Sequence, residues 1–83
     1  MTLTEVAKRL NEINSNIKYV TCDGDVIEGR AGKPVFDGFD WWGNGDYPDW
    51  VCILSMDVFD SLDLSDYTNG NGIVDYGKCI VEV

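Results

Sequence analysis

The chain has 83 residues, of which 45% are hydrophobic and 12% aromatic, with 15 acidic and six basic side chains and no histidine. This apolar content excludes a disordered chain, and a formal net charge of −9 argues against direct binding to nucleic acid or to an anionic membrane. The length is typical of one domain, so we expect a single acidic domain over residues 1–83.

The first predicted element is an amphipathic helix that begins after Thr2 and ends before Asn14. Thr2 and Glu5 have the spacing of a capping box, in which each side chain accepts a backbone N–H at the helix start. Hydrophobic residues recur every three or four positions and predict one buried stripe, formed by Leu3, Val6, Ala7, Leu10, Ile13 and Ile17.

The next predicted elements are strands. Residues 17–30 favour a hairpin, because Asp23-Gly24 is a preferred two-residue turn. Residues 35–42 ("VFDGFDWW") predict a third strand, and the apolar run 50–56 ("WVCILSM") predicts a central strand buried on both faces. Residues 73–83 predict one broken strand or two short ones.

An aspartate stands at every third position in "MDVFDSLDLSDY", residues 56–67. At helical spacing Asp57, Asp60 and Asp63 share one face and the hydrophobic residues between them another, which predicts a short helix ending near Leu64. The predicted fold is therefore α+β: an N-terminal helix on a mostly antiparallel sheet of four to five strands, with a second short helix near 56–64.

The net charge comes from one segment. Residues 34–77 contain nine aspartates and no lysine or arginine, whereas the rest of the chain has six acids and six bases. Such a surface attracts basic protein surfaces, and helical carboxylates three positions apart have a spacing comparable to that of neighbouring phosphates. Solubility is the simpler reason for such a charge.

Aromatic residues are interleaved with these acids. Trp41 and Trp42 are adjacent and point to opposite faces of an alternating strand, so we expect one of them to be partly exposed. Tryptophan is a favoured anchor in protein interfaces. The candidate partner-binding residues are Asp37, Asp40, Trp41, Trp42, Asp46, Asp49, Asp57, Asp60, Asp63 and Asp66.

In size, charge and layout the chain resembles the small acidic inhibitors that phages carry against host defence, such as anti-CRISPR proteins and DNA mimics. It also resembles the acidic immunity and antitoxin proteins that block nucleases. The resemblance implies a non-enzymatic interaction protein that binds a basic surface of a nucleic-acid-handling protein, and it includes no shared motif.

Two alternatives remain: a small sugar- or calcium-binding module, and a subunit of a larger assembly in which a partner chain covers the exposed tryptophan. Residues 67–78 align with a calcium loop at its central positions, but Tyr67 and Lys78 occupy the two end positions that require acids. A platform of aromatic rings with nearby acids is a pattern found in sugar sites. We expect no enzyme, because a cysteine or serine nucleophile usually needs a histidine base, and we expect no cofactor or metal.

Three cysteines without paired spacing, Cys22, Cys52 and Cys79, indicate reduced thiols in an intracellular protein. The N-terminus has no apolar signal-peptide core, and no run approaches the ~20 apolar residues of a membrane span. We therefore expect a cytoplasmic protein.

Overall fold

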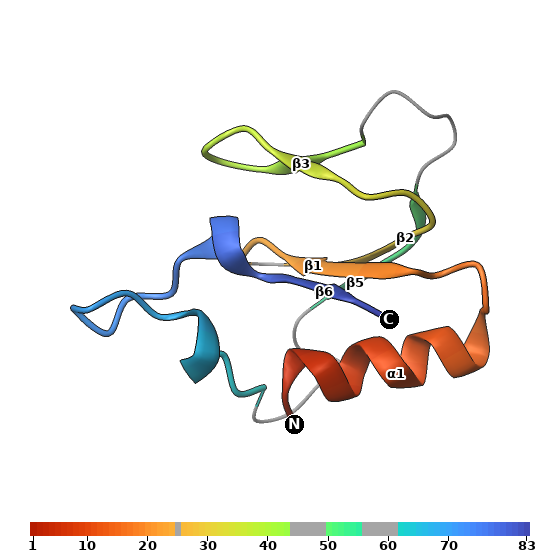
Figure 1. Ribbon diagram of the computed structural model, residues 1–83, viewed down its shortest axis with the longest axis horizontal. Helices are drawn as coiled ribbons and strands as arrows, with labels where there is room; N and C mark the ends of the chain where they lie inside the picture. The colour runs from red at the N-terminus through yellow and green to blue at the C-terminus, as the bar shows by residue number, and fades with distance from the viewer. Residues whose placement is uncertain (25, 44–49, 56–61) are drawn as a thin grey trace.

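The computed structural model describes residues 1–24, 26–43, 50–55 and 62–83. It has three layers, in which the helix α1 (Leu3–Ile13) lies on one side of a four-stranded sheet and a small two-stranded hairpin lies on the other (Figure 1). The α+β prediction, with its N-terminal helix packed on an antiparallel sheet, is confirmed. No helix in the described part of the chain is long and apolar enough to cross a membrane.

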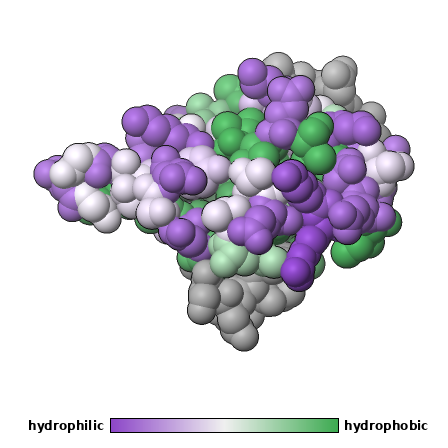
Figure 2. Space-filling model, turned by 60° about the horizontal axis from the view of Figure 1, so that its bottom comes forward, coloured by the Kyte–Doolittle hydropathy of each residue, from purple (hydrophilic) through white to green (hydrophobic). Residues whose placement is uncertain are grey.

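The helix α1 begins where the capping box predicts. The Thr2 hydroxyl accepts the Glu5 N–H at 3.2 Å, and the Glu5 carboxylate accepts the Thr2 N–H at 3.1 Å. The predicted stripe packs against the sheet through Leu3, Val6, Ala7 and Leu10, whereas Ile13 at the end of the helix is 82% exposed. On the α1 side of the molecule, hydrophilic side chains cover much of the visible surface, with hydrophobic patches between them (Figure 2).

The main sheet has the strand order β5-β2-β1-β6, and all its pairs are antiparallel. Its strands are β1 (Tyr19–Cys22), β2 (Val26–Arg30), β5 (Trp50–Ser55) and β6 (Ile80–Glu82). The predicted hairpin is confirmed as β1 and β2, but its turn lies one residue later than expected, because the Asp23 N–H donates to the Val26 carbonyl. Gly24 then takes a positive φ of 102°.

Alternation along the strands separates two faces. Val20, Cys22 and Ile27 are buried in the cluster that packs with α1. Thr21, opposite Glu28 in the register, must then point to the other face, and Arg30 follows Glu28 two residues later. We call this second face, which the small hairpin covers, the outer face.

Two predicted strands differ from the structure. Residues 35–42 do not form one strand, because the chain turns at Asp37 and makes a hairpin of β3 (Val35–Phe36) and β4 (Trp41–Trp42). The strand β5 lies at an edge of the described sheet, and Ile53 on its outer face is more than half exposed. The prediction of a central strand buried on both faces was therefore wrong.

The predicted helix near 56–64 lies mostly outside the described residues. At its described end the chain is not helical, because Asp63 forms a parallel bridge with Thr2 and its N–H donates to the Met1 carbonyl at 2.8 Å. A 3-10 turn, η2, follows at Ser65–Tyr67, and another, η3 (Tyr76–Lys78), precedes β6. Asp63 thus belongs to the contact with the N-terminus of α1 and not to a helical row.

Candidate partner-binding surface

The β3–β4 hairpin is fixed to the domain through its buried tryptophan. Trp41 is 6% exposed, and its indole N–H donates to the Tyr76 carbonyl at 3.1 Å. The ring of Phe36 lies 5.1 Å from that of Trp41, centroid to centroid, at an angle of 53°. Gly77 leaves room for the Phe36 ring, because a Cβ at position 77 would lie 3.0 Å from that ring.

The turn of this hairpin is organised by one carboxylate. Asp37 accepts the backbone N–H groups of Phe39 at 2.8 Å and Asp40 at 2.7 Å, and also the indole N–H of Trp42 at 2.6 Å. These hydrogen bonds hold the pKa of Asp37 below its usual value, and the bond from the backbone N–H of Asp40 has the largest effect. Gly38 completes the turn with a positive φ of 106°.

Two aromatic rings are exposed on this hairpin. Phe39 in the turn is 84% exposed and Trp42 is 57% exposed, and Val35, which pairs with Trp42, is also exposed. The prediction that one of the adjacent tryptophans would be exposed is confirmed, and it is Trp42. Large aromatic side chains cost free energy to keep in water, so two of them on one hairpin favour an interaction surface.

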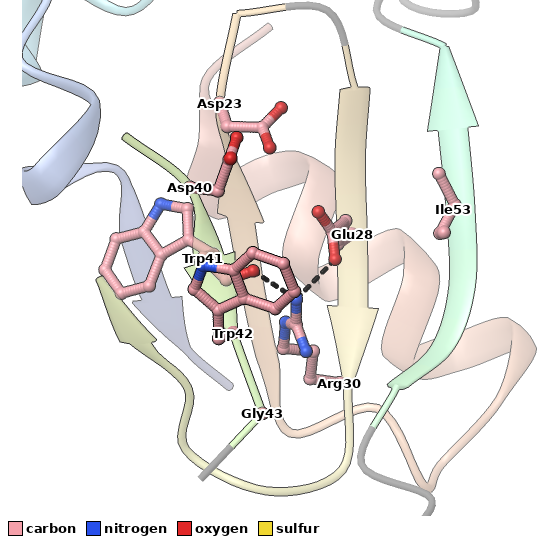
Figure 3. Close-up of a pocket in the computed structure, with 8 residues that line it drawn as sticks. All are labelled: Asp23, Glu28, Arg30, Asp40, Trp41, Trp42, Gly43 and Ile53. Carbon is pink, nitrogen blue, oxygen red and sulfur yellow. Dashed lines mark hydrogen bonds and ion pairs between the residues drawn. The ribbon is translucent and has the colours of Figure 1, made fainter. Parts of the chain in front are cut away.

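A buried arginine joins the hairpin to the sheet. Arg30 is 3% exposed, and its Nη2 donates to the Glu28 carboxylate and to the Trp41 carbonyl, the latter at 3.0 Å (Figure 3). Glu28 and Arg30 lie two residues apart on β2 and so share the outer face. The hydrogen bond from Arg30 to the Trp41 carbonyl links β2 to β4, beneath the exposed ring of Trp42.

A pocket of about 420 Å³ lies between the hairpin and the outer face. Its wall contains three carboxylates, one guanidinium and two tryptophans (Figure 3). The lining residues are Asp23, Glu28, Arg30, Asp40, Trp41, Trp42, Gly43 and Ile53. They come from β2, β4 and β5 and from the turns beside them, so the pocket exists only in the folded chain.

The predicted acidic surface is divided in the structure. Asp37 and Asp40 lie on the hairpin beside Trp41 and Trp42. Asp63 lies against the N-terminus of α1, on the other side of the sheet, where its carboxylate accepts the Ser65 N–H at 2.9 Å. Exposed Asp66 follows in η2. The remaining candidates, Asp46, Asp49, Asp57 and Asp60, lie outside the described residues.

Sequence reasoning missed three charged residues of the pocket. Asp23, Glu28 and Arg30 belong to the part of the chain that is neutral overall, so the net charge of a segment does not mark them. The alternation of Glu28 and Arg30 on one predicted strand was the available signal. Their burial under a second hairpin was not predicted, because residues 35–42 were expected to form a single strand.

The turn that partly matches a calcium loop is held by its own side chains. Asn69 accepts the N–H groups of Asn71 at 2.8 Å and Ile73 at 3.3 Å, and Thr68 pairs with Val74 across the turn. Lys78 lies 3.9 Å from the Asp75 carboxylate. Over the described ranges, no cluster of three or more acidic, cysteine or histidine side chains is arranged to hold a metal ion.

Two cysteines lie in the core. Cys22 at the end of β1 and Cys79 between η3 and β6 are both buried, and the Cys22 N–H donates to the Cys79 carbonyl at 3.2 Å. Burial raises the pKa of Cys22, and burial together with the nearby Cys22 raises the pKa of Cys79 to about 12. Both thiols therefore stay protonated at neutral pH, which does not suit a nucleophile.

Comparisons with known proteins identify no relative. No protein-family model matches the sequence, no curated protein is significantly similar to it, and no solved structure matches the fold.

Proposed function

We propose that the chain is a non-enzymatic interaction protein whose β3–β4 hairpin binds a basic surface on a partner protein. The observation that carries the proposal is the pair of exposed rings, Phe39 and Trp42, beside the carboxylates of Asp37 and Asp40. Tryptophan anchors are typical of interface hot spots, and the rim around such anchors is polar. A hairpin whose turn and base are both hydrogen-bonded also loses little conformational freedom on binding.

A nucleic-acid-handling protein is the partner class that this charge suits best. A net charge of −9 with no base in residues 34–77 complements a lysine- and arginine-rich groove, and it speeds association over a long range. We place the chain among phage-type inhibitors of host defence, similar to anti-CRISPR proteins or DNA mimics, acting in the cytoplasm. A nuclease immunity or antitoxin protein is the alternative with the same surface chemistry.

Capture from a nuclease-treated cell lysate tests the proposal. The immobilised chain should retain basic proteins at low salt and release them at high salt, because salt shortens the range of charge attraction. Once the nuclease has been washed away, competing duplex DNA should also displace these proteins, because they bind its phosphates. Phe39→Ser with Trp42→Ser should abolish capture. The matched control is Ile13→Ser, which removes an equally exposed hydrophobic side chain on the α1 side. Capture that is indifferent to salt, or that both variants reduce equally, would contradict the proposal.

A further inference from the structure

The pocket under the hairpin has a negative lining. Asp23, Glu28 and Asp40 contribute three carboxylates and Arg30 one guanidinium, so negative charge is in excess among the described residues of the lining. The Nη2 of Arg30 already donates to the Glu28 carboxylate and to the Trp41 carbonyl. An anionic ligand would meet an excess of negative charge here, whereas a cation would be attracted.

The walls of the pocket also suit a side chain with an apolar stem and a planar charged end. The ring of Trp42 forms one wall, and its orientation is fixed because its indole N–H donates to the Asp37 carboxylate. Ile53 of β5 forms another wall (Figure 3). A guanidinium stacks on an aromatic face and gains from the negative charge above the ring, while its methylene stem packs on aliphatic groups.

We propose that this pocket accepts one arginine side chain of the partner, with the guanidinium between the Trp42 ring and the carboxylate of Asp40. The proposal rests on the proposed function, since it names the group on a basic surface that the hairpin recognises. A second groove, lined by Arg9, Ile13 and Leu54 among others, is largely apolar and carries a base. It should not attract the same side chain.

Titration of the full chain with N-acetyl-arginine methylamide tests the assignment. The indole N–H resonance of Trp42, identified by its loss in Trp42→Phe, should move saturably. The citrulline analogue is the matched probe, because it has nearly the same shape without the charge, and it should bind at least about tenfold more weakly. Equal binding of the two probes, selective binding of the lysine analogue, or a stronger response to glucose would overturn the assignment.

Substitutions in the chain show where the arginine probe binds and distinguish the arginine site from the proposed function. Asp40→Asn should weaken binding of the arginine probe about tenfold, because it removes the charge of one of the carboxylates that line the pocket. Asp66→Asn removes an exposed aspartate on the α1 side and should change nothing. The indole resonance of Trp41 reports whether each variant keeps the hairpin. If the arginine probe causes no shift while capture of the partner still requires Phe39 and Trp42, the arginine site is wrong and the proposed function is still supported.

Discussion

Replacing Arg30 by methionine is expected to destabilise the chain severely. The Arg30 side chain is only 4% exposed and the Glu28 side chain 13% exposed, so both charges of the ion pair are largely buried. Methionine keeps an apolar stem in the same space but removes the donor to Glu28 and the donor to the Trp41 carbonyl. Hydrogen bonds to charged groups contribute about 1.5–3 kcal/mol each, and breaking a buried pair from one side costs about 3–5 kcal/mol.

We therefore expect Arg30→Met to lower the free energy of unfolding by about 3–5 kcal/mol, a large share of the ~5–15 kcal/mol of a typical domain. Urea denaturation followed by tryptophan fluorescence and far-UV circular dichroism measures this loss, provided that the two transitions coincide.

A double-mutant cycle with Glu28→Leu isolates the pair. Each single variant leaves one buried charge without the other, whereas Arg30→Met combined with Glu28→Leu replaces both by apolar groups. The double variant should be destabilised by less than the sum of the two single losses, with a difference of about 1–3 kcal/mol. A loss below about 1 kcal/mol for Arg30→Met, or single losses that add within about 0.5 kcal/mol, would refute the reasoning.

Three further predictions concern the core and the hairpin turn. Gly29→Ala should cost about 1–3 kcal/mol in thermal or urea unfolding, because a Cβ there would lie 2.8 Å from the Cys52 sulfur in the core. Cys79 should resist alkylation by iodoacetamide at pH 8 until the chain unfolds, since burial raises its pKa to about 12 and only the thiolate reacts. Since the folded state lowers the pKa of Asp37, its contribution to stability should be complete above the usual aspartate value of 3.8. It should be lost as the pH falls through the lower, folded pKa, and the indole N–H resonance of Trp42 should follow this loss.

Each of these predictions has a control. Gly32→Ala places a Cβ where no atom lies within 4 Å and should leave stability unchanged or slightly raised, so equal losses at positions 29 and 32 would contradict the packing argument. Cys52 is only partly buried and should be alkylated before Cys79. A Trp42 resonance that shifts near pH 3.8 or above would show that Asp37 does not hold the turn.

Local features of the sequence predicted the local features of the fold. The capping box of Thr2 and Glu5 placed the start of α1 correctly, and the turn residues near Asp23 placed the β1–β2 hairpin within one residue. The same kind of signal, Asp37 followed by Gly38, marks the β3–β4 turn, but the hydrophobic residues on both sides of it predict one continuous strand.

Long-range arrangement was not accessible in the same way. The apolar run of β5 predicts a central strand. Its actual position depends on which strand pairs with β1 on the side away from β2, and β6 from the end of the chain occupies that position. The pocket depends on the hairpin folding back over β2, so Glu28 and Arg30 gave no sign of burial in the sequence. Acids of the same sequence segment, such as Asp40 and Asp63, are separated by the sheet.

Site-specific photo-crosslinking from the hairpin tests the central claim most directly. A chain carrying p-benzoylphenylalanine in place of Phe39 should crosslink in lysate to a basic, nucleic-acid-binding protein, and high salt or duplex DNA should suppress the product. The same group in place of Ile13, an equally exposed position on the α1 side, should give no such product. Crosslinking to the same protein from both positions, or none from position 39, would contradict the assignment of the β3–β4 hairpin as the partner-binding surface.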